Sequence, residues 1–287
     1  MKMPHVAGTA EQARGFLSPH VRAGSSVGLV PTMGFLHEGH LSLVRRAKRE
    51  NDICSVSIFV NPLQFGPRED LAAYPRDMGR DLELLSAEGV DLVFSPSPES
   101  MYLPDRSTLV TENSLSRVLC GAARPGHFDG VCTVVLKLLN IIAPDRAYFG
   151  EKDYQQLQVI KRMARDLDLP VEIVGCPIVR ESDGLALSSR NIYLGEKDRA
   201  EALVLSRSLD KAEDLVRVGE TGVKSILAAV REVISGSPSV ELEYAEIRDA
   251  DDLAPLDHIE KRAVCALAAR VGRARLIDNR ILERRGS

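Results

Sequence analysis

Cysteine is scarce in this chain, with five residues among 287. They lie far apart, form no C-x-x-C pair and leave an odd count: Cys54, Cys120, Cys132, Cys176 and Cys265. Such spacing suits no disulfide framework. We therefore expect reduced thiols and a cytoplasmic protein.

Long hydrophobic runs are also missing. The strongest run, residues 131–143, contains Lys137 and Asn140 and is shorter than the roughly 20 residues that span a bilayer. The first residues, MKMPHVAGTAEQ, contain no apolar segment of the kind found in secretory signals. The run predicts a buried helix, and neither segment predicts contact with a membrane.

The charge balance offers nucleic acid no general attraction, because the formal net charge is −4 and the isoelectric point is near 5.9. Hydrophobic residues make up 44% of the chain and charged residues 27%, which excludes a disordered, collagen-like or coiled-coil protein. Small molecules are therefore the expected ligands. The length suits two domains, or one large domain with an extension.

Short apolar runs alternate with amphipathic stretches in the first part of the chain, which is typical of a parallel sheet with crossover helices. The expected strands are residues 26–30, 53–60, 90–95, 146–149 and 171–175, and the expected helices 41–50, 76–88, 130–142 and 153–167. From about Gly184 the pattern changes to a long helical stretch, a helix near 223–234, and β-like runs at 240–249, 261–270 and 273–279. We predict an α/β fold with a first domain over residues 1–183 and a smaller α+β domain over 184–287.

The segment PTMGFLHEGH, residues 31–40, follows the first expected strand, at the edge where open α/β sheets bind ligands. Gly34 and Gly39 allow a ligand to approach the backbone closely, and the start of the next helix offers unpaired N–H groups. His37 and His40 lie three residues apart and would share a helix face. Imidazoles there would stabilise the charge of a departing pyrophosphate, so the segment suits a polyphosphate.

A metal-binding pair and two surface side chains remain open as alternatives for the histidines. A metal site would need further ligands, and His37-Glu38-Gly39-His40 is one residue too short for the H-E-x-x-H zinc motif. Spacing alone supports phosphate and metal equally. Asp81 and its neighbouring carboxylates are more typical of a solvated helix face than of a metal site. The chain contains neither G-x-G-x-x-G nor a Walker A loop, which disfavours a dinucleotide oxidoreductase and a P-loop kinase.

Polar side chains follow two further expected strands at the same edge. Asn61 and Gln64 would grip hydroxyl and carboxylate groups of a polar substrate, although the same residues suit a simple turn. Lys152, within GEKD at residues 150–153, is placed to clamp phosphate. Its alternative is a helix start in which Asp153 and Gln156 form a capping box.

Another polar segment, LSSRN at residues 187–191, lies near the expected domain boundary. Ser188, Ser189 and Arg190 would grip phosphate and close over a nucleotide, although a helix cap is the commoner use of such residues. The loop RPGHFDG, residues 124–130, suits either a charged network or a substrate contact.

The segments PTMGFLHEGH, SIFVNPLQF, YPRD, RPGHFDGV, DRAYFGEKDYQQ, RESDGLALSSRN and RLIDN, in this order, resemble the pantothenate synthetase (pantoate–β-alanine ligase) family. The resemblance runs from about residue 27 to 191 and resumes in the last expected strand. It places the chain in the HIGH-type nucleotidyltransferase superfamily. It implies a Rossmann-like first domain that holds the active site, a smaller C-terminal lid domain, and a homodimer.

The resemblance also implies ATP-dependent condensation of (R)-pantoate with β-alanine, through a pantoyl adenylate, to give pantothenate, AMP and diphosphate. Mg²⁺ would accompany ATP. No metal ligand is certain: Arg80 stands where some members carry a carboxylate near magnesium, and Asp81 is a candidate that the resemblance does not favour. Neither nucleic acid nor a membrane is an implied partner.

By the same resemblance, the catalytic residues would be His37, His40, Lys152, Ser188, Ser189 and Arg190. The ATP site would comprise Met33, Gly34, Phe35, Leu36, His37, Glu38, Gly39, His40, Gly150, Glu151, Lys152, Asp153, Val179, Leu187, Ser188, Ser189 and Arg190. Gln64 would contact pantoate and β-alanine, and Gln156 would contact pantoate, with Asn61 as a further substrate contact. Leu63 stands where the family often has Met or Thr.

Three alternatives predict different behaviour. Another nucleotidyltransferase of the superfamily would keep the histidine segment but has no reason to carry NPLQF or GEKDYQQ. A hydrolase with His37 and His40 as metal ligands would retain stoichiometric metal after dialysis. A non-catalytic nucleotide-binding protein would bind ATP without producing AMP.

Overall fold

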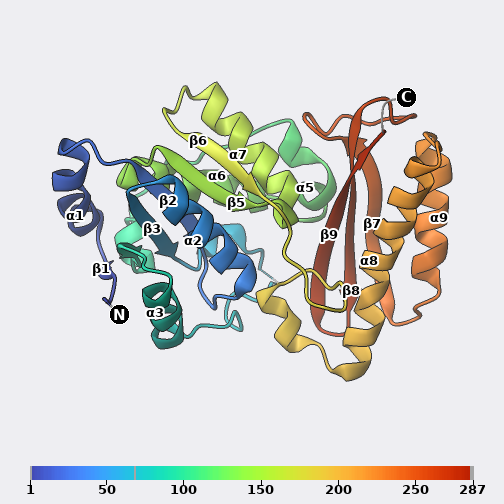
Figure 1. Cartoon of the computed structure of the whole chain (residues 1–287), viewed down its shortest axis with the longest axis horizontal. Coiled ribbons are helices and arrows are strands. Elements are labelled where there is room, and N and C mark those ends of the chain that lie inside the picture. Colours follow the sequence, from blue (N-terminus) through green and yellow to red (C-terminus); the bar gives the residue numbers. More distant parts are fainter. Residues whose placement is uncertain (1, 68, 285–287) are drawn as a thin grey trace.

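The computed structural model describes residues 2–67 and 69–284. Within them the chain forms a six-stranded parallel sheet, in the order β1-β4-β3-β2-β5-β6, and a three-stranded antiparallel sheet, in the order β7-β8-β9. Figure 1 shows the two sheets side by side, with α8 and α9 on the far side of the antiparallel sheet. The predicted combination of a Rossmann-like sheet and a smaller α+β unit is confirmed.

The strands are β1 (His5–Ala7), β2 (Val27–Thr32), β3 (Ile53–Ile58), β4 (Leu92–Phe94), β5 (Arg146–Gly150), β6 (Glu172–Cys176), β7 (Val240–Asp249), β8 (Arg262–Val271) and β9 (Ala274–Glu283). The α-helices are α1 (Ala10–Arg22), α2 (Glu38–Glu50), α3 (Met78–Ala87), α4 (Pro98–Met101), α5 (Leu119–Ala123), α6 (His127–Ile142), α7 (Tyr154–Asp166), α8 (Glu196–Arg217) and α9 (Val223–Ser235). Short 3-10 helices are η1 (Pro62–Gln64), η2 (Leu115–Arg117), η3 (Glu151–Asp153) and η4 (Ser189–Tyr193).

The strand order reverses at β2. From β2 the sheet continues through β3 to β4 on one side, whereas β5 and β6 follow on the other side. Such a switch point opens a crevice at the carboxyl ends of the two central strands. The histidine segment follows β2 and the GEKD segment follows β5, so this topology places the two segments together.

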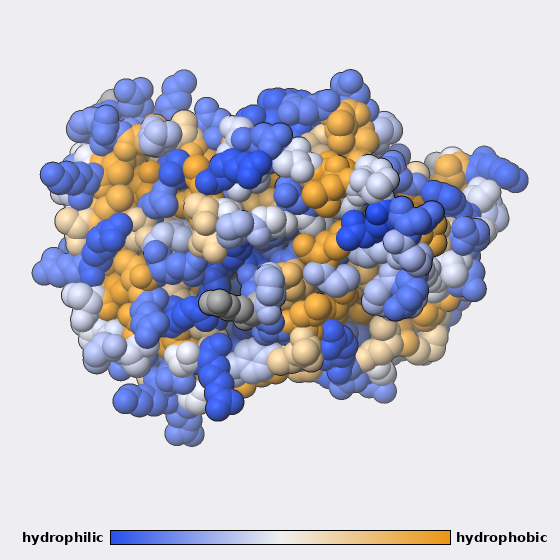
Figure 2. Space-filling view, turned by 180° about the vertical axis from the view of Figure 1, so that it is seen from behind, coloured by the Kyte–Doolittle hydropathy of each residue, from blue (hydrophilic) through white to orange (hydrophobic). Residues whose placement is uncertain are grey.

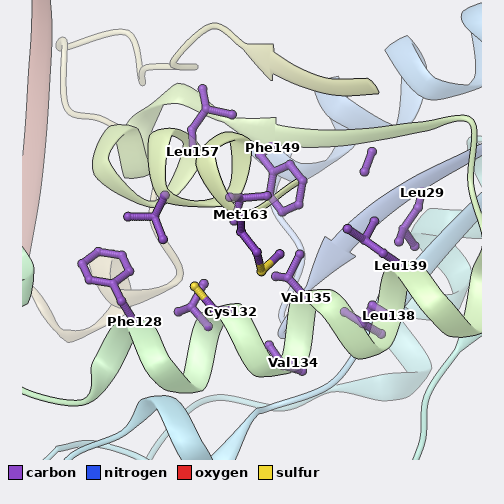
Figure 3. Close-up of a cluster of buried hydrophobic side chains, with 14 of the residues drawn as sticks. Leu29, Phe128, Cys132, Val134, Val135, Leu138, Leu139, Phe149, Leu157 and Met163 are labelled. Carbon is purple, nitrogen blue, oxygen red and sulfur yellow. The ribbon is translucent and has the colours of Figure 1, made fainter. Parts of the chain in front are cut away.

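Both faces of the parallel sheet are covered, which explains why its strands are almost continuously apolar. All six residues of β3 are buried. One face packs against α1, α6 and α7, and the other packs against α2 and α3. Figure 3 shows Cys132, Val135 and Leu139 of α6 directed toward Met163 of α7 and Phe149 of β5. The prediction that residues 131–143 form a buried helix is therefore confirmed over most of that run.

Several element boundaries differ from the sequence predictions. Helix α2 begins at Glu38 rather than at residue 41, because the His37 side chain caps it and brings the second histidine into its first turn. Neither β1 nor α1 is predicted from the sequence. Helix α1 contains Pro19 and buries only two apolar residues, Ala13 and Leu17.

Two of the expected absences can be compared with the structure. No helix in the described part of the chain combines the length and apolar character needed to cross a membrane. The five cysteines are all buried and free.

On the face seen in Figure 2, hydrophobic patches alternate with hydrophilic side chains.

Candidate active site

A cavity of about 640 Å³ lies between the carboxyl edge of the parallel sheet and the antiparallel sheet. The segments after β2, β3, β5 and β6 meet in it, together with residues of α5, α6 and the antiparallel sheet. The predicted site residues that line it are Met33, His37, Gly39, His40, Asn61, Gln64, Gly150, Lys152, Asp153, Gln156, Val179, Leu187, Ser188, Ser189 and Arg190. The structure thus brings together all six of the predicted catalytic side chains.

The two histidines are fixed by backbone N–H groups of their own turn. The N–H of Gly39 donates to Nδ1 of His37 at 3.1 Å, and the N–H of His37 donates to Nδ1 of His40 at 3.3 Å. The ring centroids are 4.0 Å apart. A neutral imidazole whose Nδ1 accepts a hydrogen bond carries its proton on Nε2. Each ring therefore offers one Nε2–H donor.

The surroundings keep both imidazoles uncharged. Burial lowers the pKa of His37 to about 4, with a further contribution from the Lys152 ammonium. Burial and the neighbouring His37 ring lower the pKa of His40 to about 3. At neutral pH the histidines therefore act as neutral donors, and Lys152 and Arg80 supply positive charge near them.

Asp81 of α3 organises the turn that precedes the histidines. Its carboxylate is 1% exposed and accepts the N–H groups of Phe35 and Leu36, each at 2.7 Å. The turn has positive φ angles of 83° at Gly34 and 50° at Phe35, and a Cβ on Gly34 would lie 3.0 Å from Asp81 Oδ2. The expectation of a solvated face at Asp81 is therefore wrong. The carboxylate serves the backbone of the turn rather than a metal.

Gly39 is required by the close approach of an imidazole. A Cβ at this position would lie 2.9 Å from both Cε1 and Nδ1 of His37. Contacts this short essentially do not occur, so any larger residue would displace the ring. The sequence predicts that Gly39 allows a ligand to approach the backbone, whereas in the structure the absence of a side chain at Gly39 accommodates the His37 ring.

Not every residue of the histidine segment faces the cavity. Leu36 is fully buried in the core between the sheet and α2 and α3. Glu38 is half exposed and forms an ion pair with Arg45, which also binds Glu88. Of the predicted ATP-site residues, Gly34, Phe35, Leu36, Glu38 and Glu151 are absent from the cavity wall as described by the structure.

Asn61 holds the η1 turn, and its amide is committed to protein groups. Its Nδ2 donates to Oε1 of Gln64 at 3.1 Å and to the carbonyl of Gly130 at 3.0 Å, and its Oδ1 accepts from the Tyr102 hydroxyl at 2.8 Å. A Cβ on Gly130 would lie 2.3 Å from the Leu63 carbonyl oxygen. The glycine in α6 therefore permits η1 to pack against the helix and carry Gln64 into the cavity wall.

The loop RPGHFDG supports the same turn from its other side. Arg124 donates to the carbonyl of Gln64 at 3.2 Å, and His127 Nδ1 contacts that oxygen at 2.7 Å. Arg124 also forms an ion pair with Glu69. Burial and the Arg124 charge lower the pKa of His127 to about 4. Of the two open interpretations, the charged network is present, and Arg124 and His127 also line the cavity.

The GEKDYQQ segment divides its side chains between structure and cavity. Asp153 is the N-cap of α7 but makes no side-chain capping bond, so the alternative of a capping box is wrong. Oε1 of Gln155 accepts the N–H of Cys120, and Nε2 of Gln155 donates to the carbonyls of Leu115 and Val118. Gln156 and Lys152 line the cavity. Gln155 also lines the cavity, but its amide is committed to these protein groups.

The LSSR segment both caps a helix and lines the cavity. Ser188 accepts the N–H of Arg190 at 3.3 Å as the N-cap of η4, so the capping interpretation holds for this serine. Ser189 donates to the carbonyl of Phe35 at 3.3 Å and ties the segment to the histidine turn. Arg190 forms a two-pronged ion pair with Asp70, with both N–O distances 3.0 Å.

Sequence reasoning missed the wall that the antiparallel sheet supplies. The side chains on or between β8 and β9 that reach the cavity include Arg270, Arg273, Arg275, Asp278 and Asn279. Several residues of the parallel half were missed as well, Tyr74 and Tyr154 among them. The available signal was the RLIDN segment, which carried part of the family resemblance but no assigned role.

The described residues offer no cluster of three or more His, Cys, Asp or Glu side chains suited to a metal ion. Four carboxylates of the cavity wall are instead paired with arginines: Glu69 with Arg124, Asp70 with Arg190, Glu243 with Arg275, and Asp278 with Arg180. A hydrolase that depends on His37 and His40 as metal ligands therefore lacks the third ligand that it would need.

Comparison with known proteins gives consistent matches. The family model described as Pantoate-beta-alanine ligase matches residues 5–281. Pantothenate synthetases of Pseudothermotoga lettingae and Thermotoga neapolitana are 56% and 55% identical to this chain, covering 91% and 96% of it and 93% and 98% of those proteins. The solved pantothenate synthetase of Thermus thermophilus is 48% identical, with a TM-score of 0.92 over 96% of this chain and 98% of that one. The pantoate-beta-alanine ligase of Francisella tularensis, solved with beta-gamma ATP and beta-alanine, is 33% identical, with a TM-score of 0.81 over 99% of each chain.

Proposed function

The chain belongs to the pantoate–β-alanine ligase family and condenses pantoate with β-alanine using ATP, and we propose that it does so through a pantoyl adenylate formed in the cavity between its two sheets. The observation that supports this route is the convergence there of two neutral imidazoles, the Lys152 ammonium and the LSSR segment. The Francisella relative, solved with beta-gamma ATP and beta-alanine, supports binding of both compounds here.

In the first step, a carboxylate oxygen of pantoate attacks the α-phosphorus of ATP. The bond from that phosphorus to the bridging oxygen of diphosphate breaks, and diphosphate leaves. Lys152 offsets the charge that develops on the leaving group, and His37 and His40 donate their Nε2–H groups to phosphate oxygens. Such fixed donors act strongly because they need no reorganisation during the reaction. Ser188, Ser189 and Arg190 close over the phosphates, with Arg190 exchanging part of its contact with Asp70.

In the second step, the free amine of β-alanine attacks the acyl carbon of the adenylate. A C–N bond forms, the C–O bond to AMP breaks, and the amine releases a proton to water. AMP is a far better leaving group than the oxide that free pantoate would have to expel. Enclosure between the two sheets protects the adenylate from hydrolysis until the amine arrives.

Pantoate recognition falls to the amides beside the phosphate groups. Gln64 contacts pantoate and β-alanine, and Gln156 contacts pantoate. Both side chains line the cavity on either side of the crevice, one after β3 and the other in α7. Asn61 acts on the substrate through Gln64, because its own amide is bound to protein groups. Val179 and the backbone of residues 33–40 and 150–153 complete the nucleotide site.

Mg²⁺ would enter with ATP and be held mainly by phosphate oxygens and water, which is its usual mode of binding in nucleotide sites. The donor set of the cavity fits this arrangement. In the described chain, Glu69, Asp70, Glu243 and Asp278 are each paired with an arginine, which leaves Asp153 as the remaining carboxylate of the wall. When bound, the ion would supply neutralisation of phosphate charge.

We also propose the arrangement of the whole protein from the family resemblance. Residues 1–183 would form the catalytic domain, and residues 184–287 would form the lid that closes over ATP. Two copies would associate as a homodimer. Free cysteines support a reducing, cytoplasmic location.

Variants of the phosphate-facing groups test this mechanism. Replacing His40→Ala or Lys152→Ala should slow adenylate formation by about 10²- to 10³-fold, since each change removes one preorganised donor. The rate is measured in a single turnover with ATP, Mg²⁺ and pantoate, and urea unfolding verifies the fold. Lys161→Ala, an exposed lysine on α7, is the control and should behave as the wild type. A wild-type rate in either cavity variant would remove that residue from the mechanism.

A further inference from the structure

The side chain of Asn279 crosses from the antiparallel sheet to the phosphate-binding turn of the parallel sheet. Its Nδ2 donates to the carbonyl oxygens of Glu151 and Lys152, each at 2.9 Å. Asn279 lies in β9 and is 4% exposed. Because both protons of one amide are used, β9 fixes two consecutive peptide units of η3. The position of Lys152 in the cavity is therefore set from the opposite sheet.

The preceding residue of β9 holds the second phosphate-binding segment. The Asp278 carboxylate binds Arg180 in a two-pronged ion pair at 2.7 and 2.9 Å and also accepts the N–H of Asn279 at 2.8 Å. The Asp278 side chain is 3% exposed. Arg180 pairs through its backbone with Ala186, and the N–H of Leu187 donates to the carbonyl of Val179. The ion pair therefore anchors the turn that leads directly into the LSSR segment.

These two contacts start from adjacent residues of one rigid strand. Strand β9 pairs with β8 along its whole length, so residues 278 and 279 cannot shift independently. On the basis of the function proposed above, we infer that Asp278 and Asn279 are positioning residues that fix Lys152 and the LSSR segment relative to each other around the triphosphate. The antiparallel sheet thereby does more than cover the cavity: it sets the geometry of the diphosphate leaving-group site.

A role of Asn279 in packing alone would predict effects on the two half-reactions different from those of a positioning role. If Asn279 only held the two sheets together, its loss would affect both half-reactions and would do so whether or not Lys152 were present. If it acts through Lys152, its loss should affect adenylate formation alone, and the effect should disappear once Lys152 is removed. A double-mutant cycle measures this dependence directly.

The test compares Asn279→Ala, Lys152→Ala and the double variant with the wild type. We expect Asn279→Ala to slow adenylate formation roughly 10- to 100-fold, the scale produced by displacing a catalytic group by about 1 Å. Its affinity for a non-hydrolysable ATP analogue, measured by calorimetry, should also fall. Aminolysis of preformed pantoyl adenylate by β-alanine should stay close to the wild-type rate. In the Lys152→Ala background, the Asn279→Ala change should have little further effect on either measurement.

Arg280→Ala is the matched control, because Arg280 lies next in β9 but forms ion pairs with Asp210 and Glu213 of α8. It should leave adenylate formation unchanged. Asn279→Ser, whose side chain is too short for both carbonyls, takes the place of Asn279→Ala if that variant fails to fold.

Equal effects of the Asn279 change in both backgrounds, or on both half-reactions, would overturn the inference. So would a wild-type rate and ATP affinity in the folded variant. If the wild-type protein binds ATP but forms no adenylate, the proposed mechanism fails, while the ATP affinities of the four proteins still decide the role of Asn279.

Discussion

The two histidines of the proposed phosphate site, His37 and His40, are kept neutral by burial. Each accepts a backbone N–H at Nδ1 and so presents a proton at Nε2. Lys152 lies in the same cavity wall and supplies positive charge, and that charge itself disfavours protonation of the rings. The arrangement gives the phosphates two directed donors without a further buried charge.

Neutral buried histidines make stability depend on pH. The pKa values of His37 and His127 are lowered to about 4, and that of His40 to about 3, below the 6.5 of an unperturbed histidine. The unfolded chain therefore takes up protons before the folded protein as the pH falls. The free energy of unfolding should decrease from about pH 6.5 downward, by about 1 kcal/mol per histidine at pH 5.5.

Urea unfolding at pH 7.5 and 5.5 measures this loss, and the variant His127→Gln should lose about 1 kcal/mol less than the wild type between the two values. An identical loss in the two proteins would show that His127 is not held neutral by the fold.

At the residue scale, type and position in the sequence were enough to predict some of the side chains that face the cavity. His37, His40 and Lys152 follow strands at the ligand-binding edge, and all three line the cavity. Asp81 was not identified correctly, because the N–H groups that it binds lie about 45 residues earlier in the chain. Spacing predicts neighbours on one element, whereas a contact between elements depends on how they pack.

At the scale of elements, a helix glycine sets the depth of a substrate-binding turn. Helix α6 contacts η1 closely only because position 130 lacks a side chain. The Gly130→Ala change should push the Leu63 carbonyl away, move Gln64, and lower kcat/KM for pantoate about tenfold or more. Steady-state kinetics at saturating ATP and β-alanine measure this effect.

Gly15→Ala provides the comparison, since a Cβ at this position in α1 would meet nothing within 4 Å. It should leave kcat/KM unchanged and stabilise the protein by up to about 1 kcal/mol, because alanine favours a helix. If Gly130→Ala also leaves kcat/KM for pantoate unchanged, η1 does not position Gln64.

The elements themselves were predictable where burial imposes a pattern. Strand β3 stands out because all its positions are buried, and helix α6 stands out because its buried positions are mostly apolar. The start of α2 was misplaced because a histidine, which is not a usual cap, takes the N-cap position. Helix α1 was missed because it buries few residues and contains a proline.

At the scale of the whole molecule, the site belongs to neither sheet alone. The parallel sheet provides the histidines, Lys152 and the glutamines, and the antiparallel sheet closes the cavity with residues of β8 and β9. This second wall could not be predicted from spacing, because it depends on how a later unit of the chain packs against an earlier one. The RLIDN segment acquires a physical role only when Asn279 is seen to contact η3.

The proposed homodimer gives a prediction for the molecule in solution. Sedimentation velocity at micromolar concentration should report twice the chain mass of 31.4 kDa. A single species at the mass of one chain would contradict the proposal. It would leave the catalytic account intact, because the cavity of one chain holds all six of the proposed catalytic residues.

Exchange of labelled diphosphate into ATP tests the central claim most directly. The purified protein is incubated with ATP, Mg²⁺ and labelled diphosphate, with and without pantoate, and before any β-alanine is added. The mechanism predicts label in ATP only when pantoate is present, because reversal of adenylate formation is the step that incorporates it. Exchange without pantoate, or no exchange although pantothenate forms once β-alanine is added, would contradict a reversible pantoyl adenylate step.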